Sequence, residues 1–167
     1  MQYLLDTNTF IQAKNSYYAF DIAPSFWTQL LEKLKQGQVA VIDAVSDEIK
    51  QGNDELKNWF REQVISQANQ IEILKAKEDA SVLATYREIA QRVAMNQIYK
   101  DSEKARFLRG ADPWLISSAK SWGAVVVTFE TLSGVGTRKV KIPDICQQTG
   151  VTFVNLYTAM RAMQIVL

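Results

Sequence analysis

A chain of 167 residues, of which 47% are hydrophobic and 10% aromatic, has enough apolar material for one folded domain, and this composition excludes an intrinsically disordered protein. Nineteen basic and eighteen acidic residues leave a formal net charge of +1, so the total charge indicates no class of partner. The sequence contains no histidine, which excludes serine or cysteine triads with a histidine base, histidine-ligated zinc and histidine-dependent ribonuclease chemistry. Any catalysis must therefore use carboxylates, lysines, hydroxyls or a bound cofactor.

The sequence also lacks the patterns of secretion and membrane insertion. Cys146 is the single cysteine and cannot form an internal disulfide. The first residues do not have the basic segment, apolar run and cleavage site of a signal peptide, and no apolar run approaches the roughly 20 residues that cross a bilayer. We therefore expect a reduced, cytoplasmic protein with no membrane segment.

Short apolar runs alternate with helical patterns along the chain. The runs are β-branched and lack polar alternation, which is typical of strands covered on both faces. Strands separated by helices favour an α/β fold with a central, mostly parallel sheet of about four to five strands. In chain order the sequence predicts a strand at 3–6, a helix at 24–34, a strand at 39–42, a helix near 54–66, a long helix at 77–96, a helix beginning at Asp112, strands at 124–128 and 151–155, and a last helix that contains Leu156, Tyr157, Met160 and Met163.

Four acids that are distant in sequence are expected at one edge of this sheet. Asp6 directly follows the first predicted strand, and Glu48 lies one helical turn beyond the second. Asp112 begins the helix that leads into the third strand, and Glu130 follows that strand. Ligands gather at the carboxyl ends of parallel strands, and carboxylates that meet there repel one another unless a cation lies among them. Oxygen ligands without histidine or thiolate favour Mg²⁺ or Mn²⁺.

Each acid taken alone also has an ordinary structural explanation. Asp6 could cap the following helix, and Asp112 before Pro113 has the pattern of an N-cap. Glu48 and Glu130 could be solvated surface charges. It is the conjunction of the four that favours a cation site over these explanations.

Ordered motifs along the whole chain resemble a known family. The segments "LLDTNTFI", "VSDEIKQG", "ADPWLISSA" and "VVVTFE" resemble the motifs of PIN domains, the metal-dependent ribonuclease fold that includes the VapC-like toxins. The segments "YLLDTNTFIQAKNSYYAFDIAPSFW", "KIPDIC" and "VTFVNLYTAMR" resemble more narrowly a PIN-like bacterial family without an assigned function. The resemblance implies a single three-layer PIN-like domain over 1–167. It also implies a Mg²⁺- or Mn²⁺-dependent endoribonuclease that is the toxin of a toxin–antitoxin pair.

The resemblance assigns roles to individual residues. Asp6, Glu48 and Asp112 match the three acids that hold metal in PIN domains, and Asn8 matches the polar residue that supports the first acid. Glu130 stands where many members have aspartate or asparagine, so its role as a fourth catalytic and metal-binding acid is an extension of the pattern. The resemblance further suggests that Thr128 and Ser133 contact the acids or a bound water. One or two cations would activate water for in-line attack on a phosphodiester and leave a 5′ phosphate.

Basic and aromatic residues near these motifs suggest contacts to RNA. Four basic side chains are candidates for the phosphate backbone, and three aromatic ones, Tyr17, Tyr18 and Phe20, for stacking on unpaired bases. A solvated mixed-charge surface and aromatic packing under a loop or in a dimer interface are the corresponding structural explanations. The basic candidates are Lys14, Arg109, Arg138 and Lys139.

Two other functions fit parts of the sequence. "DTNTF" partly matches the D-x-D-x-T motif of haloacid-dehalogenase-like phosphatases, in which Asp6 would be the nucleophile, but Asn8 stands in place of the second aspartate. A PIN-like module that binds RNA or protein without cutting is the second alternative, against which the four acids argue. The last predicted helix offers a possible contact to an antitoxin or to a second copy of the chain, with core packing as its structural explanation.

Overall fold

The computed structural model describes residues 2–167, and a five-stranded, all-parallel sheet lies at its centre. The order of the strands is β3-β2-β1-β4-β5, so the first strand occupies the middle. The α/β fold with a central sheet flanked by helices, which the sequence predicts, is confirmed. The strands are β1 (Tyr3–Leu5), β2 (Val39–Ile42), β3 (Ile73–Leu74), β4 (Val125–Val127) and β5 (Phe153–Val154).

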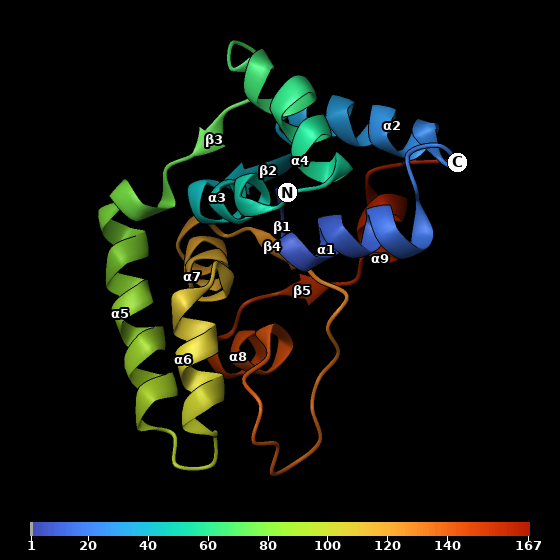
Figure 1. The fold of residues 1–167 in the computed structure, drawn as a ribbon. Coiled ribbons are helices and arrows are strands. Elements are labelled where there is room, and N and C mark those ends of the chain that lie inside the picture. The colour runs from blue at the N-terminus through green and yellow to red at the C-terminus, as the bar shows by residue number, and fades with distance from the viewer. Residues whose placement is uncertain (1) are drawn as a thin grey trace.

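Helices cover both faces of the sheet and make it the middle of three layers. Figure 1 shows α2 and α4 above the sheet, α7 and α8 below it, and α5 and α6 outside α7. The α-helices are α1 (Thr7–Gln12), α2 (Pro24–Lys35), α3 (Asp43–Gln51), α4 (Glu55–Trp59), α5 (Ala80–Met95), α6 (Asp101–Arg109), α7 (Asp112–Trp122), α8 (Ile142–Thr149) and α9 (Leu156–Ala162). Short π or 3₁₀ turns are η1 (Ala13–Tyr17), η2 (Phe60–Val64), η3 (Ile65–Gln67) and η4 (Ala76–Glu78).

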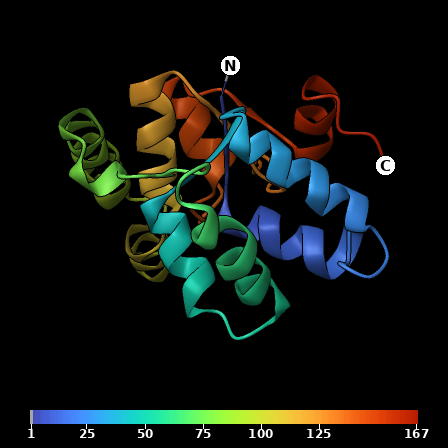
Figure 2. The same cartoon turned by 90° about the horizontal axis from the view of Figure 1, so that it is seen from above.

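The register of the central strands brings their carboxyl ends to one edge. Tyr3 of β1 pairs with Val39 of β2 on one side and with Val125 of β4 on the other. All four residues of β2 and all three of β4 are buried, as expected for parallel strands covered on both faces. Figure 2 shows β1 running from the N-terminus to the start of α1, so the residue after β1 lies at this carboxyl edge.

Several elements differ from the sequence expectation for local reasons. The long helix begins at Ala80 rather than at 77, because the Asp79 side chain accepts hydrogen bonds from the backbone N–H groups of Ser81 and Val82 and caps α5 there. The helix expected near 54–66 is α4 followed by η2 and η3. The sequence analysis did not predict β3, a two-residue edge strand, or the helices α6 and α8.

Two further expectations concern cysteine and membranes. Cys146 is buried and free, in agreement with the absence of an internal disulfide. Among the helices of residues 2–167, none is both long enough and apolar enough to span a bilayer.

Candidate active site

Asp6 is held at the carboxyl end of β1 by hydrogen bonds from two neighbouring segments. One carboxylate oxygen accepts from the backbone N–H of Thr9, so Asp6 caps α1, and the other accepts from the Thr128 hydroxyl at 2.6 Å. The residue is 1% exposed. Burial raises the pKa of Asp6 from 3.8 to about 6, although the hydrogen bonds from Thr128 and Thr9 lower it, and the charge of Glu130 raises it further.

Glu48 bridges the starts of two helices from its position in the second turn of α3. Its Oε2 accepts from the Thr7 hydroxyl in α1, and its Oε1 accepts from the backbone N–H of Ala111 at 2.8 Å. A Cβ atom on Gly110 would lie 3.3 Å from Oε1, so the glycine leaves room for this close approach. Glu48 is thereby fixed between the segment that carries Asp6 and the helix that carries Asp112.

Asp112 is the first residue of α7 and does not cap it. Ala111 occupies the N-cap position and has no capping side chain, so the N-cap explanation of Asp112 is wrong. Proline is suited to the first turn of a helix, where its missing N–H costs nothing, and Pro113 takes the second position here. The Asp112 carboxylate is therefore free of a capping role.

The charges of the other three acids act on Asp112. Burial, followed by the charges of Asp6, Glu130 and Glu48, raises the pKa of Asp112 from 3.8 to about 7, and the charge of Arg106 lowers it. The Arg106 Nη1 atom lies 3.9 Å from Asp112 Oδ2. Asp112 is thus repelled by the other three acids, and the Arg106 guanidinium compensates only part of that repulsion.

Glu130 follows β4 and is tied to both the acidic edge and α8. Its backbone N–H donates to the Thr128 hydroxyl oxygen at 3.1 Å, and that hydroxyl in turn donates to Asp6. Its Oε2 accepts from the backbone N–H of Ile142, the first residue of α8, at 2.8 Å. The glutamate therefore also caps a helix, which the sequence analysis did not anticipate.

These hydrogen bonds determine whether the acids can bind a metal ion in the observed conformation. Within residues 2–167, no group of three or more aspartate, glutamate or cysteine side chains is placed so that it could hold a metal ion as it stands. Both oxygens of Asp6, both oxygens of Glu48 and one oxygen of Glu130 face protein donors instead. In donor chemistry and in mutual repulsion the residues fit a hard divalent cation, but their carboxylates would have to reorient to share it.

The supporting polar residues lie in different places. Thr128 contacts Asp6 directly, whereas the Asn8 side chain is exposed and supplies none of the hydrogen bonds that Asp6 accepts within the described chain. Ser133 donates its backbone N–H to Asp144 at 2.9 Å, and its buried hydroxyl has no partner among residues 2–167. The structure thus brings Thr128, and not Asn8, to the first acid.

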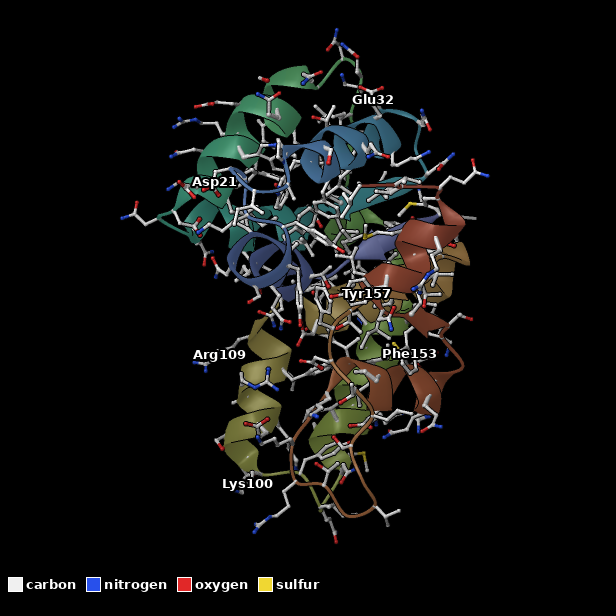
Figure 3. All side chains as sticks on the ribbon, turned by 90° about the vertical axis from the view of Figure 1, so that its right-hand side faces the viewer. Asp21, Glu32, Lys100, Arg109, Phe153 and Tyr157 are labelled. Carbon is white, nitrogen blue, oxygen red and sulfur yellow. The ribbon has the colours of Figure 1, made fainter. Side chains whose placement is uncertain are left out.

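The four basic candidates do not form one track beside the acids. Arg109 lines a pocket of about 190 Å³ together with Glu48. Lys14 forms an ion pair with Asp54 at 3.3 Å. The Arg138 carbonyl accepts from the backbone N–H of Lys100 at 3.0 Å, at the opposite end of α6 from Arg109, about 13 Å away for nine helical residues. Figure 3 shows Lys100 and Arg109 at these two ends. Lys139, next to Arg138, is exposed.

Three residues of the site were missed or not distinguished by sequence reasoning. The Thr9 backbone N–H holds Asp6, and its position three residues after Asp6 is the usual spacing of a capping aspartate. The Thr7 hydroxyl holds Glu48, a contact between distant segments that no local spacing indicates. Arg106 lies in a charged helix in which its spacing to Glu103 predicts only a surface pair. Its contact with Asp112 depends on how α6 meets α7.

The sheet and its acidic edge define a class of α/β proteins with carboxylates gathered at the carboxyl ends of parallel strands, an arrangement consistent with a PIN-like fold. Residues 3–167 match the model of the family described as "Domain of unknown function (DUF4411)", and the chain belongs to this family. No curated protein sequence matches the chain.

A solved structure shares the fold. The chain is similar to "Crystal structure of VapBC2 from Rickettsia felis bound to a DNA fragment from their promoter", with a TM-score of 0.56 and 18% sequence identity. The similarity covers 93% of this chain and 98% of that chain. At this identity the similarity concerns the fold alone.

The raised pKa values predict how the stability of the metal-free protein depends on pH. The folded state holds a proton on Asp6 at pH values at which the unfolded chain has lost it, so stability falls as pH rises from about 4 to about 7. Asp6→Asn keeps an oxygen for the cap and removes the buried charge. At pH 8 in EDTA we expect a gain of about 2 kcal/mol, or roughly 4–8 °C in melting temperature.

Thermal melting at several pH values measures this effect. The gain should shrink as the pH is lowered toward 4, where the wild-type carboxyl is protonated in both states. A variant that melts below the wild type at pH 8, or a gain that does not depend on pH, would contradict this account of Asp6.

The close approach of Gly110 to Glu48 predicts a second effect. Gly110→Ala places a methyl group 3.3 Å from Glu48 Oε1 and displaces the carboxylate from the Ala111 N–H. Loss of that hydrogen bond should cost about 1 kcal/mol, measured by denaturant unfolding. Gly134→Ala is the matched control, since a Cβ there meets nothing within 4 Å, and it should leave stability unchanged or slightly raised. Equal effects of the two substitutions would contradict the tight packing around Glu48.

Proposed function

We propose that this protein is an endoribonuclease that depends on Mg²⁺ or Mn²⁺, with Asp6, Glu48, Asp112 and Glu130 as the acids that hold the metal and support catalysis. The observation that supports the proposal is the placement of four acids from separate segments, after β1, in α3, at the start of α7 and after β4, where the charges of the other three raise the pKa of Asp112. A hard cation relieves such repulsion, and oxygen donors are its preferred ligands. The fold similarity to a VapBC2 structure supports the same class of protein at the level of architecture.

The residues of the chain have distinct parts in this proposal. When bound, the metal would supply Lewis-acid polarisation of a phosphodiester and a lower pKa for the attacking water. Thr128 and the Thr9 N–H orient Asp6, while Thr7 and the Ala111 N–H restrain Glu48. Asp112, whose pKa is raised to about 7, holds a proton near neutral pH until a cation displaces it. None of these tasks requires histidine.

The surroundings of the acids suggest where the RNA backbone lies. Arg109 shares a pocket with Glu48, and its guanidinium is suited to bind a phosphate. Lys14 would have to break its ion pair with Asp54 before it could bind a phosphate. Arg138 and Lys139 belong to a loop that contacts the end of α6 opposite to Arg109. We therefore assign the phosphate beside the acids to Arg109, and the other three cations to more distant parts of a bound strand.

The biological setting is part of the proposal. We infer that the protein acts in the cytoplasm as the toxin of a toxin–antitoxin pair, with RNA as substrate and an antitoxin as partner. The chain resembles VapC-like toxins in its motifs and a VapBC2 structure in its fold. The last helix gives little basis for a dimer contact, because Leu156, Met160 and Met163 are buried and only Tyr157 of the four named residues is exposed.

The phosphatase alternative has less support than the nuclease. The burial of Asp6, which is 1% exposed, and the hydrogen bonds to both of its oxygens constrain a nucleophile and a metal ligand alike. The phosphatase motif lacks its second aspartate, the general acid, because Asn8 stands in that place. The alternative of a module that binds without cutting keeps the same fold and differs only in activity. An activity assay therefore separates it from the nuclease.

RNA cleavage with and without Mn²⁺ tests the proposed function. Wild-type protein should cut a mixed-sequence RNA only with Mn²⁺ or Mg²⁺ and leave 5′ phosphates. Asp6→Asn should lower the rate at least about 100-fold, because removal of one charged ligand weakens the metal site. Asp21→Asn is the matched control, an exposed aspartate in the turn before α2, and it should cut at the wild-type rate.

Two results would contradict the proposal. Cleavage that persists in EDTA, or an Asp6→Asn variant that retains the wild-type rate, would remove Asp6 and the metal from the mechanism. Release of phosphate from a small ester with a trapped aspartyl phosphate would establish the phosphatase instead.

A further inference from the structure

Three aromatic rings from separate segments meet beside the acidic edge. Tyr17 ends η1, Phe129 follows β4 and Tyr157 lies in the first turn of α9. The Tyr17 ring stacks on Phe129 with 4.9 Å between centroids and 25° between planes. Tyr157 meets both rings edge-on, at 5.9 Å from Tyr17 and 6.0 Å from Phe129. We call these three residues the aromatic cluster.

The aromatic cluster differs from the other aromatic groups near it in its exposure. Tyr17 is 47% exposed and Tyr157 is 36% exposed. By contrast, Tyr18 is 8% exposed and stacks on the fully buried Phe26, and Phe20 stacks on Trp27. Of the three aromatic residues that the sequence analysis considered for base stacking, Tyr18 and Phe20 thus pack in or against the core, and Tyr17 offers an accessible ring.

A pocket connects the aromatic cluster to the acids. Glu130 lines it, and the residue before Glu130 is Phe129 of the cluster. The Lys141 ammonium donates to the carbonyl oxygen of Thr131, a residue that lines the pocket, at 3.3 Å. Figure 3 shows Tyr157 and Phe153 on the C-terminal segments that form one side of this region. The pocket has a volume of about 330 Å³ and is lined by Phe129, Glu130, Thr131, Leu132, Phe153, Asn155 and Tyr157.

We propose that the aromatic cluster and this pocket form a subsite for one unpaired base of single-stranded RNA, next to the phosphodiester that the acids act on. The inference rests on the proposed function for its position relative to the cut. Base faces stack on exposed aromatic rings in a way that tolerates any base, and a duplex does not present a free face.

Polar groups in the pocket suit the edge of a base. The Asn155 Oδ1 atom accepts from the Thr158 N–H and caps α9, which leaves the amide NH₂ of Asn155 for a base acceptor. Glu130 lines the same pocket, and the carboxylate oxygen that does not accept from the Ile142 N–H is a potential acceptor for an exocyclic amine. Lys141, which donates to the Thr131 carbonyl of the pocket wall, supplies a positive charge for an adjoining phosphate.

These features favour RNA over a protein partner as the occupant. The aromatic cluster consists of only three rings, and the pocket beside it is lined by Phe129 and Tyr157 together with a proposed catalytic acid, Glu130. A ligand that stacks on these rings and enters the pocket would therefore also lie against Glu130.

Measurements of RNA affinity on variants of the aromatic cluster test this subsite. In an Asp6→Asn background with Mg²⁺, fluorescence anisotropy would compare Tyr17→Ala, Tyr17→Phe and the parent on a single-stranded oligoribonucleotide. Tyr17→Ala should weaken binding roughly 5- to 100-fold, and Tyr17→Phe, which keeps the ring, should stay within about twofold. Tyr157→Ala should resemble Tyr17→Ala. Ile98→Ala, at an exposed apolar residue in the α5–α6 turn, is the control and should bind like the parent.

The form of the RNA separates stacking from general binding. Oligoribonucleotides with abasic positions and a duplex of the same sequence should bind more weakly than the single strand, and Tyr17→Ala should change their affinities little. Thermal melting checks that each variant is folded. An unchanged affinity of folded Tyr17→Ala for the single strand, or an equal loss on all three forms of RNA, would overturn the base subsite. The former result would leave a protein contact as the explanation of the cluster.

Failure of the nuclease and failure of the subsite give different results. If the wild type does not cut RNA but Tyr17→Ala still loses affinity for the single strand, the proposed function fails and the base subsite stands. If the wild type cuts RNA and Tyr17→Ala cuts and binds normally, the proposed function stands and the subsite is overturned.

Discussion

Repulsion among carboxylates at one edge of a parallel sheet is the constraint on which this structure depends. Asp6 is almost fully buried, and the negative charges of Asp6, Glu130 and Glu48 raise the pKa of Asp112. Such an arrangement costs folding stability near neutral pH, because the charged forms are disfavoured by burial and by one another. A hard cation would relieve this cost, which is the physical basis of the proposed metal site.

The surrounding backbone keeps the acids in place without neutralising them. Three of the acids accept hydrogen bonds from helix starts: Asp6 from α1, Glu48 from the start of α7 and Glu130 from α8. Helix N-termini favour negative charge, so each carboxylate is held at the start of the helix whose N–H group donates to it. The same bonds turn several oxygens toward protein donors, so metal binding requires these side chains to exchange partners.

The sequence predicted the features that depend on local pattern and topology. Buried strands appear in the sequence as short apolar runs, so the parallel sheet followed from the order of the segments. The parallel strands place Asp6 and Glu130 at one edge, and a shared metal site of the four acids stays a prediction. The order of the segments does not indicate whether the side chain of Asn8 or that of Thr128 donates a hydrogen bond to Asp6. Asn8 is near Asp6 in sequence but exposed, and the contact of Thr128 arises from strand pairing between β1 and β4.

Other features required the packing of whole elements. α6 has only one fully buried residue, Phe107, so its apolar pattern in the sequence is weak. The helix nevertheless places the Arg106 guanidinium beside the Asp112 carboxylate. The aromatic cluster combines residues near 17, 129 and 157, and no spacing within one segment indicates that they meet. The separation of Arg109 from Arg138 likewise follows from how the loop after β4 crosses to the start of α6.

Titration of the protein with Mn²⁺ at pH 6.5, followed by electron paramagnetic resonance, tests the central claim most directly. The account predicts binding accompanied by release of protons, because the cation displaces them from Asp6 and Asp112. Asp112→Asn should weaken binding at least about tenfold, whereas Asp101→Asn, at a fully exposed aspartate of α6, should not change it. Absence of binding, or binding that is equal in wild type and Asp112→Asn, would contradict the claim that these carboxylates share a cation.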